Sequence, residues 1–333
     1  MSIKKIAKIA GVSTATVSRV LNGSDKVRKS TADRVMVVVE DLNYRIDHVA
    51  RRMKVKSTDS LVIGLIVTDI GNPFFSNVAK GVEDITFKNK YVLMICNTNE
   101  DPEKEKFFMN SMLSEKVSGV IVVPTSGNGN FFEKLVEDGF PMVMVDRRPG
   151  HLNVDSVSIN NELGGYQATK RLIKNGHKRI GIVCGIKGLS NTEERLAGYK
   201  KALKEAEIPL SDELITYGNY IEEGGLKAME KLLSLDQSPT AVFSTNNLMT
   251  LGCIKVLYRQ KVSIPAEVAL IGFDDSTWAE ALIPPLTTVK QPGYELGTNA
   301  AEQLIKRLNN GPSNTVNIVL NPELVIRQSC GSG

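Results

Sequence analysis

The sequence predicts an α/β protein in which a small all-helical segment precedes two lobes, each built on a doubly wound parallel sheet. Two short helical patterns joined by a glycine open the chain. From Ser60 onwards, apolar runs alternate with amphipathic helical patterns, which is typical of parallel sheets with helical crossovers. This theme starts twice, and 333 residues with 42% hydrophobic content suffice for a small headpiece and two larger cores.

The first 23 residues fit two helices on either side of Gly11. Apolar residues recur at helical spacing over residues 3–10. Ser13 is a candidate N-cap for a second helix whose apolar positions fall on one face. A third pattern, Thr31–Leu42, would close a small core over both. This arrangement indicates a helix-turn-helix; an ordinary helical hairpin with a solvated basic face is the alternative.

The outer face of the second helix has side chains suited to a DNA major groove. Thr14 and Ala15 are small and can touch thymine methyl groups, while Arg19 can donate to guanine O6 and N7. The hydroxyl and amide groups expected to contact phosphates belong to Ser13, Thr16, Ser18 and Asn22. Through residue 60 the chain carries 13 Lys and Arg against 6 Asp and Glu, whereas the remainder carries 28 against 31. The basic end is therefore the one expected to bind a polyanion.

Several functional classes are not indicated. The four cysteines are far apart and the three histidines form no ligand pair, so we expect no disulfide framework, no metal and no other cofactor. No signal peptide is evident, and no apolar run approaches the ~18 residues of a membrane span. We therefore expect no membrane partner and a cytoplasmic location. Phosphate-loop, dinucleotide and nucleophile-elbow motifs are missing, although doubly wound sheets also occur in enzymes.

Ten segments are strand candidates, and polar side chains follow many of them. The segments are Leu61–Thr68, Tyr91–Thr98, Gly119–Pro124, Pro141–Asp146, Ser156–Asn160, Arg179–Gly185, Leu214–Gly218, Ala241–Thr245, Val268–Asp274 and Thr287–Pro292. Open parallel sheets bind ligands beyond the carboxyl ends of their strands. We therefore predict one cleft between the lobes, with effector-binding candidates Asn72, Phe74, Phe75, Thr125, Asp146, Arg147, Arg195, Tyr220, Asn246, Asp274 and Gln291. Asp69, Asn160, Asn247 and Asp275 occupy similar positions.

These residue types suit a sugar. Carboxylates, amides and guanidinium groups pair with neighbouring hydroxyls, and aromatic rings cover the apolar face of a sugar ring. Trp278 is a fourth candidate cover beside Phe74, Phe75 and Tyr220. Arg147 and Arg195 could share a carboxylate, so a sugar acid is the second ligand class. Taken singly, each residue also fits a structural role; their shared strand-end position favours a site.

The run AxxAGVSxxTVSRVLNG over residues 7–23, followed by a helix ending at Leu42-Asn43-Tyr44, resembles the DNA-binding headpiece of the lactose-repressor (LacI/GalR) family. The segments NPFF, VDRR, ERLAGY, TNN, IGFDD and LTTVKQP resemble cleft segments of that family and of related periplasmic sugar-binding proteins. The resemblance implies a headpiece over residues 1–47, a hinge over 48–59 and a two-lobed type I periplasmic-binding-protein-like domain over 60–330. Lobe 1 would comprise about 60–160 and 292–320, and lobe 2 about 161–290 and 321–330.

In the resembled family, the segment matching Val49–Lys56 is a hinge helix that inserts an apolar wedge into the minor groove. Met53 stands where leucine is usual, and Arg51 would accompany it at the DNA. A solvated basic linker is the alternative, because so short a helix is marginal alone.

The resemblance implies a cytoplasmic homodimeric transcription regulator, a repressor, that binds near-palindromic double-stranded operator DNA under control of a small sugar-like effector. A free sugar-binding protein and an enzyme on the same fold are the alternatives. Two departures bear on the effector. Asn247 replaces the more usual aspartate, and Leu189–Thr192 lacks the arginine found near there in purine-binding relatives, which argues against a nucleobase.

Overall fold

A computed structural model describes residues 3–21, 27–41, 61–147, 150, 152–311 and 314–331. The chain divides into two compact units, Met1–Ser60 and Leu61–Gly333, each with its own core. The predicted hinge Val49–Lys56, with Arg51 and Met53, lies outside the described residues, as does Asn22. The roles assigned to them stay predictions.

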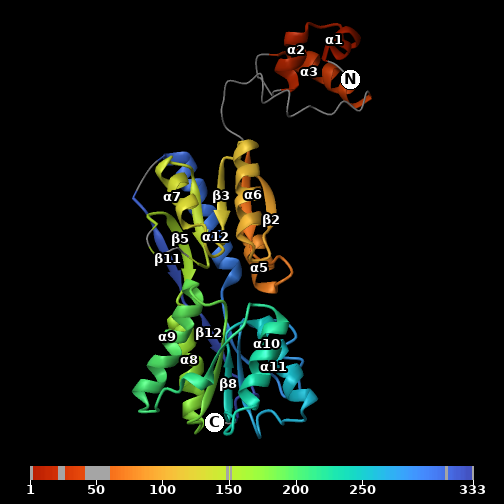
Figure 1. Cartoon of the computed structure of the whole chain (residues 1–333). Coiled ribbons are helices and arrows are strands. Elements are labelled where there is room, and N and C mark those ends of the chain that lie inside the picture. The colour runs from red at the N-terminus through yellow and green to blue at the C-terminus, as the bar shows by residue number, and fades with distance from the viewer. Residues whose placement is uncertain are drawn as a thin grey trace. The chain divides into compact units, whose positions relative to one another are not determined.

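The first unit contains three helices, α1 Ile3–Ala10, α2 Thr14–Leu21 and α3 Lys29–Asp41, drawn in red in Figure 1. Gly11 adopts a φ of +64°, which ends α1. The Ser13 hydroxyl then accepts a hydrogen bond from the Thr16 amide at 3.1 Å and caps α2, as predicted. The helices enclose a small aliphatic core made by Ile6, Ala7, Ala10, Val17, Val35, Val38 and Val39. This is the predicted helix-turn-helix, with α3 beginning two residues earlier than expected.

Lobe 1 is a six-stranded parallel sheet in the order β11-β5-β4-β3-β1-β2. Its strands are β1 Val62–Val67, β2 Val92–Asn97, β3 Gly119–Val122, β4 Met142–Val145, β5 Asp155–Ile159 and β11 Asn317–Leu320. Two helices cover each face: α5 Pro73–Lys88 with α12 Gly293–Asn310 on one, and α6 Pro102–Ser114 with α7 Gly129–Glu137 on the other. Alternate strand residues enter one core or the other, so the first strand is buried on both faces, as its continuous apolar run predicts.

Lobe 2 contains a second six-stranded sheet, in the order β12-β10-β9-β8-β6-β7. Its strands are β6 Ile180–Cys184, β7 Ile215–Tyr217, β8 Ala241–Ser244, β9 Ala269–Phe273, β10 Thr287–Lys290 and β12 Glu323–Val325, and a 3₁₀ turn, Asp212–Leu214, precedes β7. Helices α8 Asn161–Lys174 and α9 Ser190–Glu205 cover one face, and α10 Glu222–Leu233 and α11 Asn247–Arg259 cover the other. One detail differs from a wholly parallel sheet, because β12 runs antiparallel to β10.

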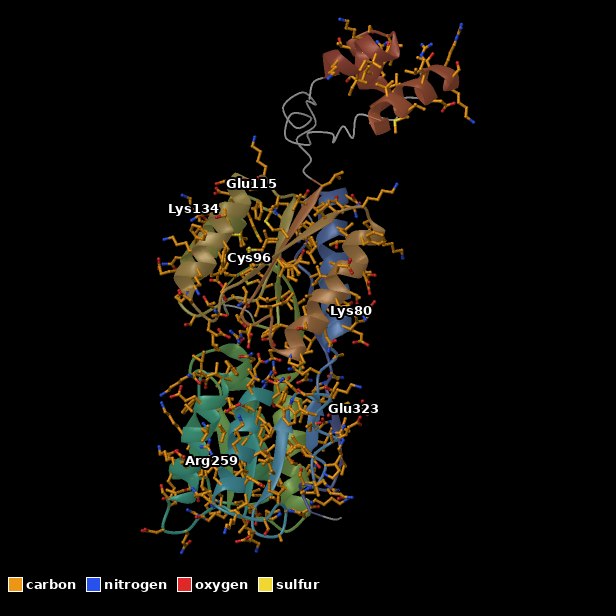
Figure 2. The ribbon with its side chains drawn as sticks, turned by 90° about the vertical axis from the view of Figure 1, so that its right-hand side faces the viewer. Lys80, Cys96, Glu115, Lys134, Arg259 and Glu323 are labelled. Atoms are coloured by element: carbon orange, nitrogen blue, oxygen red, sulfur yellow. The ribbon has the colours of Figure 1, made fainter. Side chains whose placement is uncertain are left out.

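The chain passes between the lobes after β5, after β10 and after β11, so both sheets contain late segments of the sequence (Figure 1). Charged side chains such as Lys80, Lys134 and Arg259 are exposed and point away from the cores (Figure 2). None of the helices in the described part of the chain is both long and apolar enough to cross a membrane.

Candidate functional site

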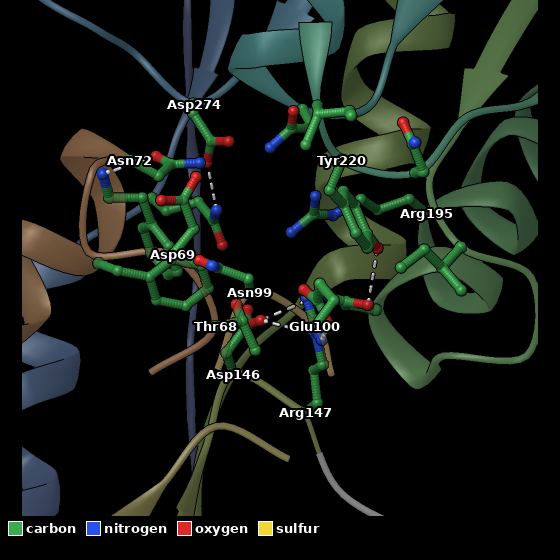
Figure 3. Close-up of a pocket in the computed structure, with 18 residues that line it drawn as sticks. Thr68, Asp69, Asn72, Asn99, Glu100, Asp146, Arg147, Arg195, Tyr220 and Asp274 are labelled. Atoms are coloured by element: carbon green, nitrogen blue, oxygen red, sulfur yellow. Dashed lines mark hydrogen bonds and ion pairs between the residues drawn. The ribbon is translucent and has the colours of Figure 1, made fainter. Parts of the chain in front are cut away.

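A cavity of about 360 Å³ lies between the lobes, at the carboxyl ends of the strands (Figure 3). This volume is within the range of small-molecule sites. Its walls come from both lobes and from the segment after β10. The lining residues are Thr68, Asp69, Asn72, Phe74, Phe75, Asn99, Glu100, Asp146, Arg147, Ile186, Asn191, Arg195, Asn219, Tyr220, Ile221, Asn246, Asp274 and Gln291.

The structure brings ten of the eleven effector-binding candidates together at this cavity, and Thr125 is the exception. Thr125 donates its amide to Glu105 Oε1 at 2.6 Å and its hydroxyl to Glu105 Oε2 at 3.0 Å. Glu105 is a buried carboxylate of α6, and it commits both donor groups of Thr125 to holding the loop after β3. The placement of Thr125 at the cavity was therefore wrong.

Three other strand-end residues have structural partners instead of facing the cavity. Trp278 packs against the hydrophobic core of lobe 2. Asn160 caps α8 by accepting from the Leu163 amide at 3.1 Å. Asp275 forms an ion pair of 2.7 Å with Arg327.

The sequence reasoning missed several lining residues. Asn99 and Glu100 follow β2, so the expectation that ligands bind beyond the carboxyl ends of parallel strands also applies to them. Asn191 lies in the first turn of α9, and Asn219 follows β7. Asn219 directly follows the predicted strand Leu214–Gly218, so the position after that strand also indicates it, whereas the helical position of Asn191 is not indicated by the strands.

Arg147 is occupied by partners within its own lobe. Its two terminal nitrogens donate to both Glu100 oxygens at 2.7 and 2.6 Å, and its Nε lies 3.4 Å from Asp146 Oδ2. Its guanidinium carbon lies 5.1 Å from the centre of the Tyr220 ring in lobe 2, a cation–π distance. A paired and stacked guanidinium is a poor anchor for a ligand anion.

Arg195 enters the cavity from α9 in lobe 2 (Figure 3). Its Nε donates to Asn161 Oδ1 at 2.8 Å and one terminal nitrogen donates to the Thr245 carbonyl at 2.6 Å. The guanidinium carbon lies 3.7 Å from the centre of the Phe273 ring. These neutral partners hold the side chain in place and leave its positive charge uncancelled by any bonded carboxylate.

Asp146 and Asp274 are buried carboxylates. Burial raises the pKa of Asp146, although Arg147 and Arg195 act against this shift. Burial likewise raises the pKa of Asp274, opposed by Arg195 and by the hydrogen bond from the Gln291 amide. Both residues adopt positive φ, as do Asn99, Glu100 and Tyr220, so five of the nine such non-glycine residues in the described ranges line this cavity. Backbone strain of this kind concentrates at functional sites.

Unpartnered buried atoms also gather here. Thr68 Oγ1, Asp146 Oδ1 and Gln291 Oε1 are buried and have no hydrogen-bond partner within the described chain. Leaving such an atom unsatisfied costs about 1–3 kcal/mol. Unsatisfied buried groups of this kind are ones that a polar ligand or an ordered water can satisfy.

The helix-turn-helix presents its predicted contact residues unevenly. Thr14, Ala15 and Arg19 are exposed, and Thr16 and Ser18 are half-buried. The exposed Ser13 hydroxyl is engaged in the helix cap and also lies 2.9 Å from the Thr16 hydroxyl. Ser13 and Thr16 therefore support α2 directly, and any phosphate contact would share these hydroxyls.

A helix-turn-helix headpiece and a two-lobed cavity define a class of regulator that couples a DNA-binding unit to a binding-protein-like domain. Residues 2–47 match the model for "Bacterial regulatory proteins, lacI family", and residues 169–330 match that for "Periplasmic binding protein-like domain". A ribose operon repressor of Haemophilus influenzae is 38% identical over 329 residues, covering 98% of each chain. The repressor PurR of Histophilus somni is 37% identical over the same coverage.

Solved structures are similar in fold. A complex of the transcriptional regulator CelR with cellobiose superposes with a TM-score of 0.76 at 30% identity, covering 99% of each chain. A Lac repressor dimer bound to operator and an anti-inducer superposes with a TM-score of 0.88 at 24% identity, covering 100% of this chain and 99% of that one. The chain belongs to the lacI family of bacterial regulatory proteins and is a DNA-binding transcriptional regulator.

Proposed function

We propose that this regulator is a repressor whose operator binding is controlled by a neutral monosaccharide, with ribose as the first candidate. The observation that carries this proposal is the charge of the cavity. Four carboxylates line it, from Asp69, Glu100, Asp146 and Asp274, against two guanidinium groups. Since Glu100 already occupies Arg147, only Arg195 is available to a ligand anion.

A neutral polyhydroxyl ring suits these groups. Its hydroxyls can donate to Asp146 and Asp274 and accept from Arg195 and the side-chain amides. The rings of Phe74 and Phe75, whose centres are 5.0 Å apart in an edge-to-face arrangement, together with Tyr220, offer apolar cover for the C–H face. A sugar acid, the second choice from sequence, is disfavoured because Arg147 and Arg195 are not both free to share its carboxylate. The name of the Haemophilus relative supports a pentose.

A purine base is the second candidate, because relatives of 36–37% identity are named PurR. Calorimetry on the DNA-free protein would separate the candidates, using ribose, glucose, gluconate, ribose 5-phosphate, hypoxanthine and guanine. We expect saturable binding of a neutral sugar only. Binding of a purine or an anionic sugar without any neutral one would overturn the assignment. We assign no catalytic step to the cavity.

A homodimer on near-palindromic double-stranded DNA in the cytoplasm completes the proposal, since a two-fold dimer presents two identical headpieces. Apolar side chains are exposed on both lobes: Phe87 and Val92 on lobe 1 are 77% and 63% exposed, and Tyr258 and Ile283 on lobe 2 are 85% and 99% exposed. β2 is also an edge strand with an unpaired side. Sedimentation of the double variant Tyr258→Asp/Ile283→Asp should show a shift from dimer to monomer at micromolar concentration. An unshifted dimer would place the interface elsewhere.

A further inference from the structure

Two asparagines form a reciprocal link between the lobes. Asn72 Nδ2 donates to Asn247 Oδ1 at 3.0 Å, and Asn247 Nδ2 donates to Asn72 Oδ1 at 2.9 Å. Asn72 caps the first helix of lobe 1, and Asn247 is the first residue of α11 in lobe 2. Their exposed fractions are 3% and 1%. The pair is therefore a buried two-bond connection across the cleft.

The orientation of both amides is dictated by further bonds. Asn72 Oδ1 also accepts from the Phe74 amide at 3.0 Å, so Asn72 must present its nitrogen to the oxygen of Asn247. Asn247 Oδ1 accepts from the Leu248 amide at 2.7 Å, and its Nδ2 donates to Ser276 Oγ at 3.2 Å. The carboxamide at position 247 thus uses both its donor hydrogens and its acceptor oxygen.

An aspartate at position 247 would have the same shape but could not make the same bonds. It has no donor when ionised, so it would set an oxygen against Asn72 Oδ1, whose orientation is held by the Phe74 amide. It would also add a negative charge near Asp274, whose Oδ2 accepts from the backbone N–H of residue 247 at 3.3 Å. The side-chain amide of Asn247 is therefore what allows both bonds of this link to form, because an aspartate could only accept from Asn72 Nδ2.

Asn247 does not line the main cavity, unlike the residues of a second side-chain hydrogen bond between the lobes. That link joins Asn191 Nδ2 to Asp146 Oδ2 at 3.0 Å, and both of its residues face the ligand space. A ligand can compete with the link between Asn191 and Asp146, whereas Asn247 acts on the approach of the lobes without facing the ligand space.

We propose that Asn247 is a positioning residue for effector binding, because its amide pair with Asn72 holds the lobes closed around the cavity before the effector arrives. The inference rests on the proposed function only for the nature of the effector. If the link is broken, only a fraction of the ligand-free molecules is closed. The apparent dissociation constant then equals that of the closed state divided by the closed fraction. A closed fraction of about one tenth would weaken sugar binding about tenfold.

The test compares Asn247→Asp with Ser276→Ala in the full-length protein. Ser276→Ala is the matched control, since it removes one partner of the same carboxamide but leaves both bonds to Asn72. Small-angle scattering without ligand should give a larger radius of gyration for Asn247→Asp, while Ser276→Ala should match the wild type. Saturating ribose should return Asn247→Asp to the wild-type radius, and calorimetry should show about tenfold weaker binding.

Equal radii for Asn247→Asp and wild type, or equal opening in Ser276→Ala, would overturn the role. If Asn247→Asp does not fold by circular dichroism, Asn247→Ala breaks the same link without the charge and is judged by the same criteria. The scattering of ligand-free protein tests the link whether or not ribose binds. Failure of the proposed function would instead appear as absent binding to the wild type.

Discussion

At the residue scale, the two cavity arginines differ in what they can offer a ligand. Arg147 is held by Glu100 in a bidentate ion pair, whereas Arg195 bonds only to a neutral amide oxygen and a backbone carbonyl. Asp274 shares the cavity with Arg195 and keeps its carboxylate oriented through Gln291. Arg195 and Asp274 are therefore the charged groups that we expect to matter most to a sugar.

Asp274→Asn should weaken sugar binding by about 1.5–3 kcal/mol, because it removes charge-assisted hydrogen bonds to hydroxyls. DNA binding without sugar should be retained. Asp275→Asn is the matched control, since this neighbouring carboxylate pairs with Arg327 and does not line the main cavity. Calorimetry that finds equal affinities for both variants would contradict the role of Asp274.

Arg19→Ala should cost about 1–3 kcal/mol of operator affinity and relax the preference for one base pair in each half-site. The reason is its exposed position on the outer face of α2, from which a guanidinium can pair with guanine. Fluorescence anisotropy on operator and random duplexes measures both effects. Equal losses of affinity on the two duplexes would instead indicate that Arg19 contacts a phosphate. Arg34→Ala is the control, because Arg34 is exposed on α3 and not on the outer face of α2.

At the element scale, α8 and α9 pack so closely that only glycine fits at their contact. A Cβ atom at Gly165 would lie 2.2 Å from the Arg195 carbonyl oxygen, and one at Gly198 would lie 2.1 Å from the Glu162 carbonyl oxygen. The same helix α9 carries Arg195 into the cavity. The spacing of two helices thus sets the position of a side chain that lines the cavity.

Gly165→Ala should lower the free energy of unfolding by about 1–3 kcal/mol, because its methyl group would clash with the backbone of α9. A backbone atom cannot move away from the clash as easily as the end of a flexible side chain. The substitution should also weaken sugar binding by displacing Arg195. Thermal unfolding and calorimetry on one preparation measure both. An unchanged midpoint with unchanged affinity would mean that the helices separate without consequence for the site.

At the scale of the whole molecule, four buried or half-buried aspartates fall into two groups with opposite effects on the pH dependence of stability. Although burial acts to raise them, the pKa values of Asp155 and Asp275 are held low, chiefly by hydrogen bonds from Arg307 and Arg327 respectively. They stabilise the fold above the ordinary aspartate pKa of about 4, and this stability is lost as pH falls through their lowered values. Asp146 and Asp274 have raised pKa values, so their contribution to stability declines as pH rises from about 4 towards those values.

Sugar binding should release protons at pH values between the ordinary aspartate pKa of about 4 and the raised pKa values of Asp146 and Asp274. Hydroxyl donors favour ionised carboxylates, so the sugar should lower the raised pKa values of Asp146 and Asp274, and affinity should increase as pH rises through that range. Calorimetry in buffers with different ionisation enthalpies measures the protons exchanged. The Asp274→Asn variant should release fewer protons than the wild type on binding the sugar. Net proton uptake by the wild type would show instead that the carboxylates bind the sugar in their neutral form.

Much of this protein is determined by short-range patterns in its sequence. Apolar spacing together with Gly11 and Ser13 predicts the helix-turn-helix, because a helix and its caps depend on neighbours within a few residues. Continuous apolar runs predict the buried strands. The positions after the strands account for most of the predicted residues that line the cavity, since parallel strands finish at one edge, but Arg195 reaches it from within α9.

Only the tertiary structure decided which of those side chains are available to a ligand. Thr125 is bonded to Glu105 and does not line the cavity. Arg147 is bonded to Glu100, which favours our proposal of a neutral sugar over a sugar acid. The direction of β12 and the pairing of Asn72 with Asn247, 175 residues apart, are likewise decided by long-range contacts. Sequence periodicity predicts the face of a helix or strand on which a residue lies. It does not predict which group satisfies a buried polar atom, because that partner is placed beside it by the fold and can come from a distant part of the chain.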